Sequence, residues 1–136
     1  MFAKDISILV VDDMMTMRKL VKKSLMDLGF TKIDEADNGE NGWNKVQAAQ
    51  ASGTGVQLII SDWNMPQMTG VELLKRVRSN PTTANIAFII LTAESEKSQV
   101  IEAAQFKVSG YMTKPFTTAQ IEEKLKAAFG VVQKAA

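Results

Sequence analysis

The sequence predicts a doubly wound α/β domain with a five-stranded parallel sheet and five helices. Short aliphatic runs alternate along the chain with amphipathic stretches whose apolar residues recur at helical spacing. Turn-forming residues separate the two kinds of segment, and strict alternation of strand and helix favours parallel strands joined by crossover helices. The 136 residues fit one domain of ordinary size, so 1–136 is expected to be a single domain.

The first half of the chain is expected to contain three strands and two helices. The strands are placed at 8–11, 32–36 and 58–60. The first helix is expected to end at Gly29, and the second carries Trp43 and Val46 toward the core. The residues of 48–55 are small and polar, and they predict a loop before the third strand.

The second half continues the alternation. Two further strands are expected, at 86–91 and 110–112. Three helices are expected, around Val71 to Val77, over 96–106, and around Ile121 to Leu125. Asn80-Pro81 breaks the first of these helices.

Composition excludes several classes of function. Sixteen basic and fifteen acidic residues give a net charge of +1, which argues against a nucleic-acid partner. No apolar run approaches the ~18 residues of a membrane span, and the N-terminal residues lack a signal-peptide layout, so we expect a cytoplasmic protein without membrane contact. The absence of cysteine and histidine removes disulfides, thiolate metal sites and the usual general base.

Polar residues stand where the predicted strands end: Asp12 and Asp13 after the first, Asp62 after the third, Thr92 after the fourth and Lys114 after the fifth. Sites in doubly wound folds lie beyond the carboxyl ends of the strands, so these side chains are expected to converge. Each alone could be a helix cap or a solvated side chain. Their coincidence at several strand ends favours a functional site.

The residue types at these strand ends suit phosphoryl transfer. Adjacent carboxylates repel one another without a counter-charge, and an oxygen-only acidic site suits Mg²⁺. Phosphoryl transfer requires mainly positioning and charge neutralisation, which a metal and Lys114 supply without a histidine base. Asp62 is the expected nucleophile, because Asp12 and Asp13 sit together and are better placed as metal ligands. A main-chain carbonyl after Asp62 could complete the ligand set.

Four segments carry a resemblance to a known family. They are 10–13 (Val-Val-Asp-Asp), 61–66 (Ser-Asp-Trp-Asn-Met-Pro), 92–94 (Thr-Ala-Glu) and 109–116 (Ser-Gly-Tyr-Met-Thr-Lys-Pro-Phe). In order and spacing they resemble the receiver domain of bacterial response regulators, above all the stand-alone receivers of chemotaxis, and the resemblance covers nearly the whole chain. It implies a flavodoxin-like fold, no effector domain, a monomer, and a signalling protein that catalyses only its own phosphorylation and dephosphorylation.

The resemblance also implies a ligand set. A partner histidine kinase would phosphorylate Asp62 while Mg²⁺ is bound by Asp12, Asp13, Asp62 and the main-chain carbonyl of Asn64. Lys114 would bind the phosphoryl group directly.

Further roles implied by the resemblance concern the switch. Thr92 would hydrogen-bond the phosphoryl group, and Tyr111 would swing inward as Thr92 moves. Asn64 and Glu94 match positions that tune the rate of phosphoryl hydrolysis, and a cis peptide is expected before Pro115.

The output of the switch is less determined than its chemistry. In chemotaxis receivers a flagellar motor switch protein docks on one surface, which here would comprise Lys97, Val100, Ala104, Phe106, Lys107, Tyr111, Thr113 and Lys124. Phe106-Lys107 replaces a small residue and a glycine, Thr113 replaces an aliphatic residue, and Met14 replaces an aromatic one. A receiver that does not bind the motor, such as a phosphate sink or a regulator of another output, therefore stays open, as does the involvement of a phosphatase.

Two readings from other functional classes fit less well. A phosphatase of the haloacid dehalogenase type has its nucleophilic aspartate at the end of the first strand and needs a second aspartate two positions later. Here the two acids are adjacent, and position 14 is Met14. A flavodoxin-like cofactor binder needs a hydroxyl-rich phosphate loop, which the aspartate pair would oppose. The basic residues Arg18, Lys19, Lys22 and Lys23 could form a kinase-docking patch, but an ordinary solvated helix face is favoured.

Overall fold

The computed structural model describes residues 5–53, 55–93 and 97–135, with only the backbone described for 129–135. Over these residues the chain forms one parallel five-stranded sheet with the strand order β2-β1-β3-β4-β5. The strands are β1 (Ser7–Val11), β2 (Lys32–Ala36), β3 (Leu58–Ser61), β4 (Ala87–Thr92) and β5 (Gly110–Thr113). The predicted doubly wound parallel sheet is confirmed.

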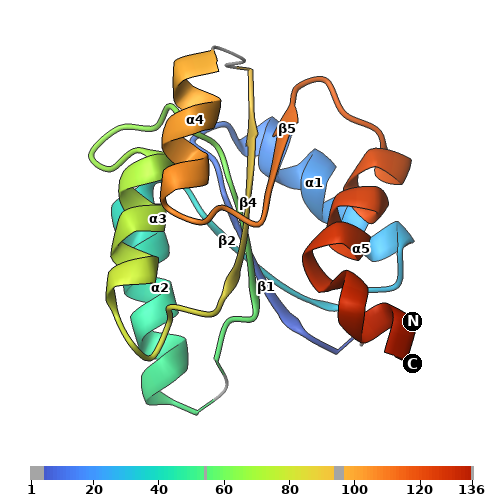
Figure 1. Cartoon of the computed structure of the whole chain (residues 1–136), viewed down its shortest axis with the longest axis horizontal. Coiled ribbons are helices and arrows are strands. Elements are labelled where there is room, and N and C mark those ends of the chain that lie inside the picture. The colour runs from blue at the N-terminus through green and yellow to red at the C-terminus, as the bar shows by residue number, and fades with distance from the viewer. Residues whose placement is uncertain (1–4, 54, 94–96, 136) are drawn as a thin grey trace.

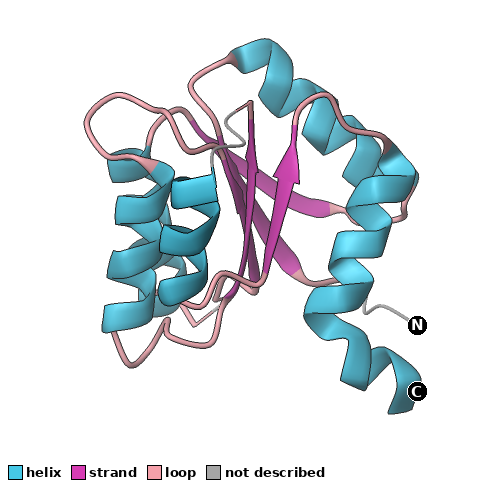
Figure 2. Ribbon diagram, turned by 45° about the horizontal axis from the view of Figure 1, so that its top comes forward, coloured by secondary structure: helices cyan, strands magenta, loops and turns pink. Residues whose placement is uncertain are grey.

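Helices cover both faces of this sheet. They are α1 (Met15–Asp27), α2 (Gly39–Ala51), α3 (Gly70–Ser79), α4 (Lys97–Gln105) and α5 (Thr118–Ala135). Helices α1 and α5 lie side by side on one face, while α2, α3 and α4 cover the other (Figures 1 and 2). Within the described residues no helix is both long and apolar enough to span a bilayer.

The two-sided cover explains why the inner strands are continuous aliphatic runs. Leu9 and Val11 belong to the core on the α2–α4 side, and Ile8 and Val10 belong to the core against α1 and α5. Successive side chains of a strand point to opposite faces. Because both faces are buried, every residue of β1 after Ser7 is aliphatic.

One predicted boundary is wrong. A loop was expected from 48 to 55, but α2 continues to Ala51 and is capped at Ser52. Alanine and glutamine favour helix, so the small residues of this stretch extend α2 instead of ending it. The turn is made by Gly53 and Gly55, whose φ angles are 82° and 63°.

Candidate functional site

The carboxyl ends of the strands bring Asp12, Asp62 and Lys114 together. The ammonium of Lys114 lies 2.9 Å from Asp12 Oδ2 and 3.1 Å from Asp62 Oδ2. All three side chains are largely buried, with 12% of Lys114, 5% of Asp12 and 9% of Asp62 exposed. The convergence that was predicted for these strand ends is present in the structure.

Asp13 completes an acidic cluster with Asp12 and Asp62. One carboxylate oxygen from each residue lies within 4.8 Å of the others, and Asp13 is exposed while its two neighbours are buried. Three carboxylates in such proximity form an all-oxygen donor set that opens to solvent on one side. This donor set fits a hard divalent cation such as Mg²⁺, which prefers oxygen ligands and keeps some of its waters.

The electrostatics of the cluster are set by burial and by Lys114. Burial raises the pKa of Asp12, and the hydrogen bonds from Met14 N–H and Lys114 offset this only in part. Burial alone would lower the pKa of Lys114, but its contacts with Asp12 and Asp62 outweigh burial and raise that pKa. At neutral pH the ammonium therefore stays charged between the two carboxylates.

Four hydrogen bonds hold Asp12 in place. Its N–H donates to Ala36 of β2, and its main-chain oxygen accepts from Arg18 Nη1 at 2.7 Å. Its Oδ1 accepts from Met14 N–H at 2.9 Å, and its Oδ2 accepts from Lys114. Main chain and side chain of Asp12 are thus both oriented by neighbours from four different segments.

Asp62 is held as firmly at the end of β3. Its N–H donates to Val11 O at 2.9 Å, and its Oδ1 accepts from Trp63 N–H at 2.7 Å. Its main-chain oxygen accepts from Ser61 Oγ at 2.9 Å and packs against Gly70, where a Cβ atom would lie 2.0 Å from that oxygen. Glycine is required at the start of α3 because the main chain of Asp62 passes so close.

The residues assigned to the switch flank this cluster. Thr92 is 1% exposed at the end of β4, and its main-chain oxygen accepts from Lys114 N–H at 2.9 Å. Tyr111 is half-buried, is paired with Ile90 in the sheet, and packs against the core on the α4 side. Because Thr92 follows Ile90 by two residues, Thr92 and Tyr111 lie on the same face of the sheet.

The structure describes only some of the remaining predicted residues. Asn64 is exposed in the loop after Asp62, and its metal and hydrolysis roles stay predictions. Glu94 lies outside the described residues. The Lys114–Pro115 peptide is cis, as the resemblance implied.

The expected output surface is only partly continuous. Tyr111, Thr113 and Lys124 line a shallow cavity of about 310 Å³ beside α5. Phe106 instead turns inward and packs against the core, with Lys75 of α3 4.8 Å from its ring centre. Lys107 adopts a φ of 61°, so the left-handed conformation that favours glycine is kept without glycine.

The basic residues of α1 differ from the interpretation as a wholly solvated face. Lys23 is 74% exposed and Lys19 60% exposed, but the side chain of Arg18 is only 15% exposed. Arg18, Lys19 and Lys22 all contact the carboxylate of Glu35 on β2. Sequence reasoning missed Glu35, because a charged residue within an edge strand gives no sign of which helix it faces.

Comparison with known proteins places the chain in a family. Residues 8–126 match the family described as the response regulator receiver domain. The chain belongs to this family. The observed strand order is that of flavodoxin and CheY, so fold and family agree.

Curated relatives are similar over nearly their whole length. Chemotaxis protein CheY-3 of Vibrio cholerae serotype O1 is 41% identical over 126 residues, which are 93% of this chain and 93% of that protein. Chemotaxis protein CheY of Pseudomonas aeruginosa is 41% identical over 122 residues, covering 90% of this chain and 94% of the relative. A solved structure of Vibrio cholerae chemotaxis protein CheY4 has a TM-score of 0.81 at 30% identity and covers 91% and 98% of the two chains.

Proposed function

We propose that this receiver belongs to a response regulator and that its Asp62 accepts a phosphoryl group from a phosphohistidine of a partner kinase, with Mg²⁺ bound beside it. The observation that carries the proposal is the buried contact of Lys114 with Asp12 and Asp62, at 2.9 and 3.1 Å, within the cluster that Asp13 completes. Two buried carboxylates share this one ammonium, and the third acid of the cluster, Asp13, lies beside them.

In the proposed transfer, a carboxylate oxygen of Asp62 forms a bond to phosphorus as the phosphorus–nitrogen bond of the donor breaks. The leaving imidazole keeps the electron pair and takes a proton from solvent. Lys114 neutralises negative charge on the transferred group, since an ion pair near a protein surface at ~4 Å is worth roughly 4 kcal/mol before desolvation. The receiver turns over no substrate other than its own phosphoryl group.

The Mg²⁺ ion would be held by Asp12, Asp13, Asp62 and the main-chain carbonyl of Asn64, and it supplies charge neutralisation for the transferred group. Asp12 is preorganised for this role by its four hydrogen bonds. Asn64 and Glu94 are proposed to tune hydrolysis by their positions two residues after Asp62 and Thr92.

Thr92 and Tyr111 are proposed to convert phosphorylation into a change of surface. Moving a population from 1:99 to 99:1 needs about 5.5 kcal/mol of preference for one state. One hydrogen bond to a charged group contributes roughly 1.5–3 kcal/mol, so Thr92 alone is insufficient. Lys114 and the packing of Tyr111 against the α4 side are proposed to supply the rest.

The proposed output is control of the flagellar motor in the cytoplasm, by docking on the motor switch protein, with a phosphatase ending the signal. The chemotaxis names of the relatives support this output. The inward orientation of Phe106 favours a second candidate, a receiver that does not bind the motor and acts as a phosphate sink or on another partner.

The test of this function uses Mg²⁺ and a small acyl phosphate as donor, with intact mass as the readout. Wild type is expected to gain one phosphoryl group and Asp62→Asn none. Absence of modification, or modification that survives in Asp62→Asn, defeats the proposal. Binding of the phosphorylated protein to a motor switch peptide then separates the two outputs.

A further inference from the structure

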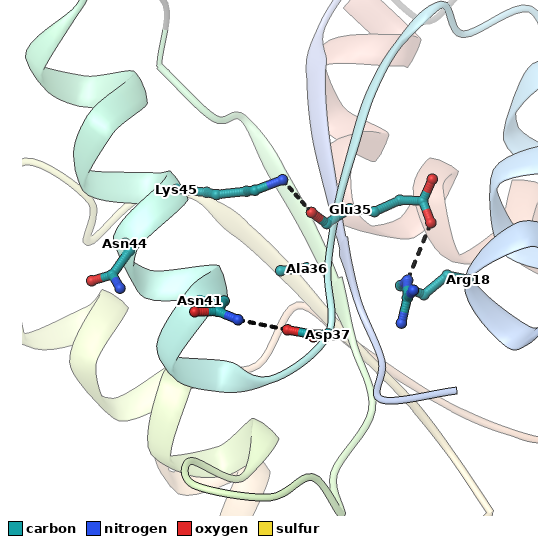
Figure 3. A pocket seen from close by; sticks show the side chains of 7 residues that line it. All are labelled: Arg18, Glu35, Ala36, Asp37, Asn41, Asn44 and Lys45. Atoms are coloured by element: carbon teal, nitrogen blue, oxygen red, sulfur yellow. Dashed lines mark hydrogen bonds and ion pairs between the residues drawn. The ribbon is translucent and has the colours of Figure 1, made fainter. Parts of the chain in front are cut away.

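Arg18 joins the acidic site to the edge of the sheet. Its Nη1 donates to the main-chain oxygen of Asp12 at 2.7 Å, and its Nε donates to Glu35 Oε1 at 3.1 Å. Figure 3 shows Arg18 and Glu35 pointing toward one another beside a cavity of about 450 Å³. The planar guanidinium presents its donors in a fixed geometry, so one group restrains two partners at once.

Glu35 is itself restrained from both faces of β2. The side chain of Glu35 is 19% exposed. Its Oε2 also forms ion pairs with the ammonium groups of Lys19, at 3.0 Å, and Lys22, at 3.6 Å, both on α1. From the opposite face Lys45 of α2 donates to its main-chain oxygen (Figure 3). A carboxylate held in this way is a fixed anchor for the guanidinium of Arg18.

The carbonyl that Arg18 holds belongs to the peptide joining Asp12 to Asp13. A peptide unit is planar, so holding its oxygen sets the direction in which the chain continues to Asp13. The Asp12 carboxylate has further support from Met14 N–H and Lys114. The carboxylate of Asp13 is exposed, and its direction depends on the orientation of this peptide.

We propose that Arg18 and Glu35 are a positioning pair for the divalent-cation site, holding the Asp12–Asp13 peptide so that both carboxylates face Asp62. The inference rests on the proposed function, because it concerns the same magnesium site. Neither residue touches the reacting atoms: Arg18 acts through the main chain of Asp12, and Glu35 acts through Arg18. Partners that orient metal ligands in this way change metal affinity by about 10- to 100-fold.

The test measures Mg²⁺ affinity alone, without a phosphoryl donor. A Trp43→Phe background leaves Trp63, next to Asp62, as the only tryptophan, and its emission is titrated alongside calorimetry. Arg18→Gln is expected to bind Mg²⁺ about 10-fold more weakly. Arg18→Lys keeps the charge but replaces the two-pronged donor, and it is expected to weaken binding by about threefold.

Lys19→Gln is the matched control, because it removes the same charge from the same Glu35 carboxylate without touching the main chain of Asp12. Its Mg²⁺ affinity is expected to stay within about twofold of wild type. If Arg18 acted only as a positive charge near the acids, its removal would tighten binding. Equal or tighter binding by Arg18→Gln therefore overturns the proposal.

A double-mutant cycle tests the order of action. Glu35→Gln alone is expected to weaken Mg²⁺ binding several-fold, but to add little in the Arg18→Gln background. Additive effects would refute the claim that Glu35 acts through Arg18. Thermal unfolding in chelator checks each variant, and if Arg18→Gln does not fold, unchanged affinity in Arg18→Lys overturns the proposal instead.

Mg²⁺ binding by wild type distinguishes a failure of the proposed function from a failure of the positioning pair. If wild type fails to bind Mg²⁺ at millimolar concentration, the proposed function itself is refuted. If wild type binds and Arg18→Gln binds equally well, only the positioning pair is refuted.

Discussion

Two arginines hold main-chain carbonyl groups at opposite ends of the sheet. Arg78, in the last turn of α3, donates to the carbonyl oxygen of Ile86 beside the amino end of β4. It also donates twice to the carbonyl oxygen of Lys107, at 3.0 and 3.2 Å, shortly before β5 begins. Arg18 donates to the carbonyl of Asp12 at the carboxyl end of β1. The guanidinium of Arg78 joins two loops, whereas that of Arg18 supports an acidic cluster.

The charges around the two arginines differ. Arg78 makes its main-chain bonds to neutral carbonyls, and burial lowers its pKa. At the other end carboxylates crowd around Lys114, and burial raises the pKa of Asp12. The hydrogen bonds of Arg78 therefore stabilise the fold at the amino end of the sheet, whereas the carboxyl end buries an aspartate whose ionisation opposes folding.

The substitution Gly70→Ala is expected to have the largest effect, because it should lower both the stability of the fold and the affinity for Mg²⁺. A Cβ atom there would lie 2.0 Å from Asp62 O, so the main chain must shift. We expect a loss of about 3 kcal/mol in urea unfolding and weaker Mg²⁺ binding. Gly110→Ala is the control, since its Cβ would meet Ile89 at an ordinary 3.5 Å; equal losses in both variants would contradict the argument.

A change at Arg78 is expected to lower stability without affecting the acidic site. Arg78→Met removes the donors to the carbonyls of Ile86 and Lys107, and should lower the free energy of unfolding by about 2 kcal/mol. The phosphorylation rate per folded molecule should not change. Arg76→Met, on the exposed side of the same helix, is the control; a slower phosphorylation of Arg78→Met would show that the two ends are coupled.

The smallest expected effect is a pH dependence with opposite signs at two aspartates. The raised pKa of Asp12 means that the folded protein binds this proton more tightly than the unfolded chain, whose carboxyl pKa is near 3.8. As pH rises from 3.8 through the folded pKa, Asp12 ionises at the expense of stability. In chelator, Asp12→Asn should therefore gain stability relative to wild type between pH 4 and 7.

Asp34 provides the opposite case on the edge of the sheet. Burial would raise its pKa, but the hydrogen bonds from Lys45 and from Glu35 N–H, together with the nearby lysine charges, outweigh burial and lower that pKa. The stability from Asp34 is present above the unfolded pKa and is lost as pH falls through the folded pKa. The loss of unfolding free energy in Asp34→Asn, relative to wild type, should therefore become smaller toward acid pH. Urea unfolding from pH 3 to 7 measures the free energy of unfolding of each variant relative to wild type. If this difference changed with pH in the same direction for both variants, the assigned causes would be contradicted.

Most of the fold could be predicted, because strands buried on both faces leave an unambiguous pattern. β1 and β3 are nearly uninterrupted aliphatic runs, and the prediction for 32–36 matches β2. The end of α2 was missed because the small and polar residues that suggested a loop include alanine and glutamine, which favour helix.

The candidate site could likewise be predicted only in part. Asp12, Asp62 and Lys114 could be placed together because each directly follows a strand, and the ends of parallel strands meet. The contact of Arg18 with Glu35 could not be predicted, because it depends on how α1 lies across the edge strand β2. Likewise, the packing of Phe106 beside Lys75 of α3 could not be predicted, because the two residues are distant in sequence.

The contact between Asp12 and Lys114 spans 102 residues of sequence. A ribosome adding roughly 5–20 residues per second would release the first partner roughly 5–20 s before the second. During that interval the nascent chain contains the aspartates that follow β1, and later the one that follows β3, but not yet Lys114. The acidic site is therefore completed only when β5 joins the sheet, so a truncated or half-translated chain cannot assemble it.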